Sequence, residues 1–143
     1  MAEVANKVVR GTFGKLWLNG KLLANVKSFE AKITLNYETI NVNNELADQQ
    51  RYLGYSVAGT MVLHKIDSYV INLLKTAITT GSLPALKIVG ALADPDSNGS
   101  ERVELYNVTI DEVTLAQWEN ASVGEESVPF KAGGYRMIDT IND

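Results

Sequence analysis

The sequence predicts a β-rich α+β fold: an antiparallel β-sandwich or barrel with one packed α-helix. Two observations lead to this class. Stretches of alternating apolar and polar residues recur along the 143 residues, and a single stretch has helical spacing instead. Strands that surround one helix favour a sandwich or barrel with the helix at its side or end. A chain of this length fits one domain, which we place at 1–143.

The N-terminal part predicts a hairpin followed by a long strand. Residues 13–18 and 21–26 flank Asn19-Gly20, and this dipeptide between apolar runs is the strongest short-range hairpin signal. Residues 28–40 then alternate strictly, so we expect one face to cover a core and the other to be wet. The apolar face holds Phe29, Ala31, Ile33, Leu35 and Tyr37, and the polar face holds Glu30, Lys32, Thr34, Asn36 and Glu38.

The next stretch, residues 41–54, is polar and has no sustained periodicity. It predicts a long loop, with or without a short helical piece. Long ordered loops are uncommon in compact domains and usually serve a purpose such as binding. Residues 55–65 return to period two and predict another strand.

One helix is expected over about 67–80. Asp67 or Ser68 can cap its start, and apolar residues from Val70 to Ile78 follow the i, i+3, i+4 rule that gives a single buried stripe. Gly81 supplies a C-terminal stop.

The C-terminal half predicts three further β segments. Residues 85–93 form the first, and residues 93–101 form a turn by composition. The second covers 102–117, where shifts in the apolar phase suggest bulges or a strong bend. The third covers 127–141, where Gly133-Gly134 marks a bend or a close approach.

The residues themselves predict no catalytic, cofactor or metal site, and therefore no enzyme. The chain has no cysteine and a single histidine, His64, which we interpret as a surface or interface residue. Residues 94–99 imitate the opening of an EF-hand loop, but Leu105 stands where the bidentate glutamate is needed, so a turn is favoured and only weak calcium binding stays open. The carboxylates from Asp111 to Glu126 are scattered, and we expect them to be solvated face charges.

Charge and hydropathy limit the partners. A net charge of -4 argues against tight nucleic-acid binding, which needs a clustered basic surface. The start of the chain does not read as a secretory signal, and no stretch approaches the ~18–20 apolar residues of a membrane helix. We therefore expect a soluble cytoplasmic protein without a membrane anchor. From the residues alone, we therefore expect the chain to be a β-rich domain with a functional loop and with polar strand faces that need a partner.

Several stretches that cover nearly the whole chain carry a family resemblance. They are GTFGKLWLNGK (11–21), SFEAKITLNYE (28–38), GYSVAGTMVLHKIDS (54–68), LPALKIVGALADP (83–95), ERVELYNVTIDEVTLAQWEN (101–120) and VGEESVPFKAGGYRMIDTI (123–141). In their combination, order and overall length they resemble the tail tube proteins of contractile phages and phage-tail-like particles. The resemblance is strongest to the group found in defective prophages of Gram-positive bacteria.

The resemblance implies a subunit of hexameric rings, in which each copy gives strands to a shared β-barrel around a channel and packs its helix outside. Rings stack through an extended loop, here about 41–54, and terminal arms, here an N-terminal arm of about 1–12. The tube sits inside a contractile sheath, crosses the target envelope, and conducts DNA without sequence-specific binding when a capsid is attached. Such particles assemble in the bacterial host cytoplasm. No cofactor or reaction is involved.

The resemblance also gives the candidate site residues and partners. The expected partners are further copies of the chain, the sheath protein, the baseplate or tube initiator, and the tail terminator. The proposed channel-lining residues are Glu30, Lys32, Thr34, Asn36 and Glu38, and the proposed ring-stacking residues are Asn43, Asn44, Glu45, Asp48, Gln49, Arg51 and Tyr52.

Three alternatives stay open at this point. A tube of a contractile bacteriocin or secretion system would have the same sequence features as a phage tube. A monomeric β-sandwich module could use the 41–54 loop to bind a ligand or peptide. An enzyme comes third, because one histidine and no paired nucleophile are available.

Overall fold

The computed structural model describes residues 14–93 and 99–139. They form one seven-stranded, fully antiparallel sheet of order β2-β1-β5-β6-β7-β4-β3 and one helix, α2, so the predicted fold class is confirmed. The elements are β1 (Gly14–Leu18), β2 (Lys21–Leu23), β3 (Val26–Ile40), β4 (Gln49–His64), α2 (Tyr69–Thr80), β5 (Leu86–Leu92), β6 (Glu101–Ile110) and β7 (Glu125–Asp139).

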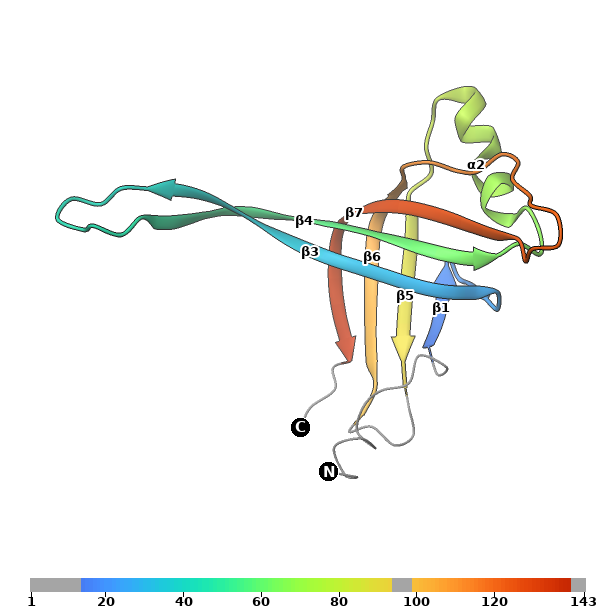
Figure 1. The fold of residues 1–143 in the computed structure, drawn as a ribbon, viewed down its shortest axis with the longest axis horizontal. Coiled ribbons are helices and arrows are strands. Elements are labelled where there is room, and N and C mark those ends of the chain that lie inside the picture. Colours follow the sequence, from blue (N-terminus) through green and yellow to red (C-terminus); the bar gives the residue numbers. More distant parts are fainter. Residues whose placement is uncertain (1–13, 94–98, 140–143) are drawn as a thin grey trace.

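The sheet folds over itself into two layers that share β7. In Figure 1, β3, β4 and the first half of β7 cross in front of β1, β5, β6 and the second half of β7. The first half of β7, up to Ala132, pairs with β4, whereas the rest of the strand pairs with β6. The core lies between the layers, where the rings of Phe29 and Phe130 stack at 5.9 Å. Its most buried side chains are Leu16, Leu18, Met61, Leu63, Val70, Leu86, Ile88, Leu105, Val108, Val128 and Phe130.

The bend in β7 falls at the predicted glycines. A Cβ at Gly134 would lie 2.6 Å or less from ring atoms of Tyr106, and one at Gly133 would lie 2.9 Å from Cβ of Asn107. The two glycines therefore leave room for the Tyr106 and Asn107 side chains of β6 to lie against the backbone of β7. The predicted close approach is therefore confirmed.

The local turn and cap signals are also confirmed. Asn19 and Gly20 have φ values of 53° and 89°, the two positive values that a type I′ hairpin turn requires. Asp67 Oδ1 accepts a hydrogen bond from the Tyr69 N–H at 3.1 Å where α2 begins. Gly81 closes the helix with φ 80°, and its N–H donates to the Ala77 carbonyl.

A bulge in β6 explains the first predicted shift of apolar phase. Leu86 of β5 pairs with Val108, but Ile88 pairs with Leu105, so one extra residue sits in β6. Asn107 takes a φ of 52° there. Leu105 and Val108 consequently both point into the core although they are three residues apart.

Two predicted boundaries are wrong. Residues 49–54 are not loop, because they begin β4 and pair with the end of β3, which leaves only residues 41–48 as the connection. The β segment predicted for 102–117 ends at Ile110, which pairs with Phe130. Beyond it the Asp111 N–H still donates to the Pro129 carbonyl of β7 at 2.9 Å, but residues 111–117 belong to no strand of the described sheet.

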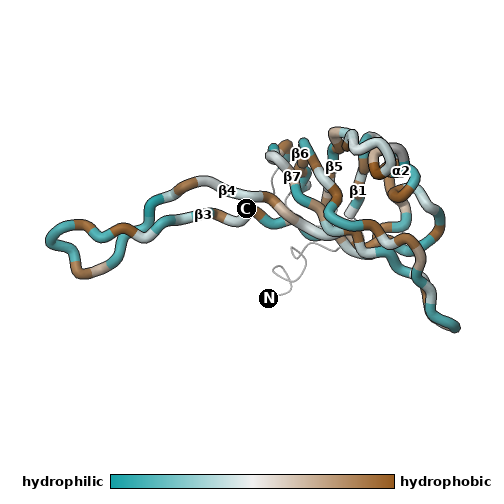
Figure 2. Tube along the Cα trace, turned by 90° about the horizontal axis from the view of Figure 1, so that it is seen from above, coloured by the Kyte–Doolittle hydropathy of each residue, from teal (hydrophilic) through white to brown (hydrophobic). Residues whose placement is uncertain are grey.

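The expectation that the apolar face of residues 28–40 covers a core is wrong for most of its length. Phe29 packs on the core, but Ile33, Leu35 and Tyr37 are 45%, 47% and 52% exposed. The reason is that the outer part of the β3–β4 hairpin projects far beyond the body (Figures 1 and 2). The predicted N-terminal arm, about 1–12, and most of the turn predicted over 93–101 lie outside the described residues.

Candidate assembly surface

The projecting hairpin is the most unusual feature of the described chain. β3 pairs only with β4, and β4 pairs with β7 only from Val57 onward. Residues 49–56 therefore have β3 on one side and no strand on the other. Both edges of the outer hairpin leave backbone N–H and C=O groups unpaired, and such edges readily pair with strands of another chain.

One face of this hairpin is apolar. Ile33 lies opposite Val57, Leu35 opposite Tyr55, and Tyr37 opposite Tyr52. The rings of Tyr37 and Tyr52 meet edge to face at 5.9 Å, and Tyr55 makes the same kind of contact with Tyr135 of β7. Apart from Val57, these side chains are 38–52% exposed. The contacts between the tyrosine rings hold the side chains of this row in place, yet no other part of the described chain covers them.

The opposite face carries the five proposed channel-lining residues in one row. Alternation along β3 places Glu30, Lys32, Thr34, Asn36 and Glu38 on this side, and all five are exposed. Lys32 Nζ lies 3.4 Å from Glu30 Oε1, and Glu38 is paired in register with Arg51 of β4. The structure therefore brings these residues together on one solvated face.

The proposed ring-stacking residues lie at the end of the hairpin but in two different elements. All seven are exposed. Asn43, Asn44, Glu45 and Asp48 belong to the connecting loop, and Gln49, Arg51 and Tyr52 belong to β4.

Sequence reasoning missed the apolar residues of this tip. Leu46 is fully exposed at 106%, and Val42 and Leu53 are 43% and 62% exposed. The signal was present in the sequence, because leucine and valine interrupt an otherwise polar stretch.

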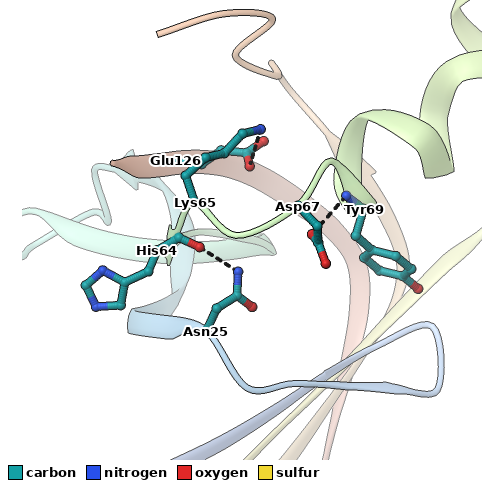
Figure 3. Close-up of polar contacts among 6 residues, drawn as sticks. All are labelled: Asn25, His64, Lys65, Asp67, Tyr69 and Glu126. Atoms are coloured by element: carbon teal, nitrogen blue, oxygen red, sulfur yellow. Dashed lines mark hydrogen bonds and ion pairs between the residues drawn. The ribbon is translucent and has the colours of Figure 1, made fainter. Parts of the chain in front are cut away.

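His64 lies at the other end of β4, where the backbone is tied down (Figure 3). The His64 N–H donates to the Asn25 carbonyl at 2.7 Å, and Asn25 Nδ2 donates back to the His64 carbonyl at 2.7 Å. The imidazole points away from Glu126, whose carboxylate faces Lys65 at 3.7 Å (Figure 3). This arrangement fixes a strand end and contains no nucleophile beside a base.

The best-formed ion pairs join different strands of the sheet. Glu104 of β6 is 9% exposed and accepts from Lys87 of β5 at 2.9 Å and Arg136 of β7 at 2.7 Å. These two hydrogen bonds hold the pKa of Glu104 below its ordinary value. The pKa of Glu125 is lowered in the same way by a hydrogen bond from Lys27. Both are cross-strand links on the sheet.

Neither a metal cluster nor a membrane-spanning helix is found in the part of the chain that the structure describes. No group of three or more histidine, cysteine, aspartate or glutamate residues within 14–93 and 99–139 is placed to hold a metal ion. The one helix there, α2, has 12 residues and is too short to cross a bilayer.

Comparisons with known proteins agree with this geometry. The model of a family described as phage tail tube protein matches residues 2–139. The chain is 29% identical to the phage-like element PBSX protein XkdM of Bacillus subtilis (strain 168), over 100% of this chain and 99% of that protein. It is 30% identical to the uncharacterised protein YqbM of the same organism, over 91% and 90% of the two chains.

Two solved structures show the same fold. A chain of the PVC extracellular contractile injection system, solved as a sheath–tube complex in the extended state, superposes with a TM-score of 0.72 at 10% identity, covering 98% of both chains. A chain of the anti-feeding prophage cap gives 0.71 at 10% identity, covering 92% and 91%. The chain belongs to the phage tail tube protein family, and it is a structural subunit of a tail tube.

Proposed function

We propose that six copies of this chain close into a ring, and that such rings stack into the inner tube of a contractile tail, a conduit through the target envelope. The observation that supports this most is the two-faced hairpin of β3 and β4. It exposes an ordered apolar row on one side, a polar row on the other, and two unpaired edges.

The apolar row and the edges both favour burial between copies. Exposed apolar patches of several hundred Å² are rare on monomeric proteins and usually mark interaction sites. Closing strands of several chains into one barrel removes unpaired edges altogether. A neighbouring copy that covers Ile33, Leu35 and Tyr37 and pairs with the hairpin satisfies both requirements at once.

With the apolar row covered, the opposite row faces the enclosed space. The proposed channel-lining residues are Glu30, Lys32, Thr34, Asn36 and Glu38. Two glutamates and one lysine give this row a small acidic excess. A surface of that sign repels the phosphate backbone weakly, which suits DNA in transit without sequence-specific binding.

The end of the hairpin is the proposed contact between rings. The residues concerned are Asn43, Asn44, Glu45, Asp48, Gln49, Arg51 and Tyr52. We place the N-terminal arm, about 1–12, in the same role and treat residues 1–143 as one tail-tube domain. The exposure of all seven hairpin residues supports the assignment of ring stacking to the hairpin end.

A tube subunit inside a contractile tail is expected to contact other tail proteins as well. Chains with this fold come from a sheath–tube complex, a tube-terminating cap and a baseplate. We therefore propose contacts with a sheath protein, a baseplate or tube initiator and a tail terminator, in a virion or tail-like particle assembled in the host cytoplasm. The subunit catalyses no reaction, needs no cofactor and has no membrane anchor.

Paired variants at neighbouring positions test the proposal. Ile33→Asp puts a charge on the apolar row, whereas Lys32→Asp puts the same side chain on the polar row one residue away. Both positions are exposed, so both variants should fold with unchanged circular dichroism. Sedimentation and electron microscopy at rising concentration should show rings or tubes for the wild type and Lys32→Asp, and monomers for Ile33→Asp. A wild type that stays monomeric at every concentration would favour the ligand-binding module instead.

A further inference from the structure

A second uncovered apolar surface lies beside α2. It is a groove of about 310 Å³ between the helix and the end of β6. Three of its apolar residues, Ile78, Leu83 and Leu115, are 61%, 67% and 83% exposed. Two carboxylates, Asp111 and Glu112, also line it. Within the described residues, this groove and the outer hairpin are separate apolar surfaces on one chain.

The groove and the hairpin tip lie at opposite ends of the molecule. Figure 1 shows α2 at one end and the β3–β4 connection at the other, and the rotated view in Figure 2 keeps them apart. With 15 residues, β3 spans about 50 Å, while the 7 residues of β5 span about 23 Å. The tip therefore extends well beyond its own body and cannot fold back onto its own groove.

We propose that the groove beside α2 receives the hairpin tip of a copy in the neighbouring ring, with the Leu46 side chain as its anchor. This inference rests on the stacking of rings proposed above and specifies where the tip binds. A projection at one end and a recess at the other form a head-to-tail contact, which repeats from copy to copy without limit. Such a contact extends a tube.

The size of the groove fits this occupant. A cavity of about 150 Å³ lined by apolar side chains accepts benzene, so the 310 Å³ groove has room for one leucine side chain and part of its neighbours. Leu46 is the most exposed large apolar residue of the described chain.

The absence of cysteine from the sequence allows a direct contact test. A disulfide forms only when the two Cα atoms approach within about 7 Å. In tubes of a Leu46→Cys, Ile78→Cys double variant, mild oxidation should link successive copies into a ladder on a denaturing gel. A Leu46→Cys, Lys15→Cys variant carries its second cysteine at an exposed position on β1, outside the groove, and should stay monomeric on the gel. Equal ladders in both variants, or none in either, would overturn the proposal.

A single substitution gives an independent readout. Leu46→Ala removes most of the anchor and should raise the protein concentration needed for tube growth about ten- to a hundredfold, while ring formation is unchanged. Unchanged growth would contradict the inference. A reconstruction of the wild-type tube decides the matter even if the cysteine variants do not assemble, because Leu46 must lie against Ile78 of the next copy. Tubes with Leu46 elsewhere would refute this groove but leave the tube function intact, whereas a lack of tubes would refute the function itself.

Discussion

Gly59 of β4 lies between Ala31 of β3 and Phe130 of β7, two residues inside the point where the β3–β4 hairpin leaves the body, and replacing it with alanine should weaken the fold severely. A Cβ at this position would lie 2.7 Å from the Phe130 ring and 2.9 Å from Cα of Ala31, and closer still to the Glu30 carbonyl oxygen. Two of these three contacts are backbone atoms of β3, which is paired with β4 over its whole length. Relief therefore requires the two strands to separate locally.

The expected cost of Gly59→Ala is about 3 kcal/mol, the upper part of the range for overpacked cores. In a domain of this size the melting temperature should fall by about 10 °C. Gly90→Ala is the matched control, because its Cβ would meet only the Phe29 ring edge at 3.1 Å, a side chain that can turn aside. The reduced entropy of the unfolded chain offsets that strain, so Gly90→Ala should stay within about 1 kcal/mol of the wild type. Urea titrations of the three proteins measure the difference, and equal stability of the two variants would refute the reasoning.

Two further predictions concern charge. Because Lys87 and Arg136 lower the pKa of Glu104, its carboxylate stabilises the fold above its unfolded pKa, and this contribution is lost as the pH falls through the folded value. The gap in urea midpoint between the wild type and Glu104→Gln should therefore be largest at neutral pH and should narrow as the pH falls through the folded pKa of Glu104; a gap that widens in acid would contradict the pairing. Glu30→Lys and Glu38→Lys should each change the free energy of unfolding by less than about 0.5 kcal/mol, since both sites are exposed. In a particle with a capsid these reversals should slow DNA passage, and a variant that unfolds would show that the row is buried.

Local signals in the sequence were sufficient for several elements. The Asn19-Gly20 turn and the Gly81 helix end need only the conformations of the residues themselves, so neighbours in sequence decide them. The helix stripe predicted from Val70 to Ile78 is similarly readable as far as Ala77, because Val70 and Ala77 are buried in the core of the same domain, but Ile78 at its end is 61% exposed.

The boundaries that could not be predicted depend on distant partners. Residues 49–54 are strand because β3 pairs with them, yet polar side chains on both faces of a solvated strand remove the alternation that would reveal it. Residues 111–117 show the converse, since the pairing of β6 with β7 ends at Ile110 and only the Asp111 N–H continues it, by donating to the Pro129 carbonyl.

The periodicity of β3 identified the two faces but not what covers them. Alternation shows that Ile33, Leu35 and Tyr37 share one face of the strand. The general rule that the apolar face of a strand covers a hydrophobic core then assigns this face to the core of the same chain. The projecting hairpin shows instead that the cover must come from elsewhere. For the candidate site, the row from Glu30 to Glu38 was predictable from period two, whereas the Leu46 tip needed the structure to show how far it projects.

The most direct test of the central claim is a reconstruction by electron cryomicroscopy of tubes grown from the purified wild-type chain. We predict stacked rings of six copies, with the row from Glu30 to Glu38 facing the channel and Ile33, Leu35 and Tyr37 covered by a neighbouring copy. Tubes in which the apolar row faces solvent, or a chain that forms no rings, would contradict the account.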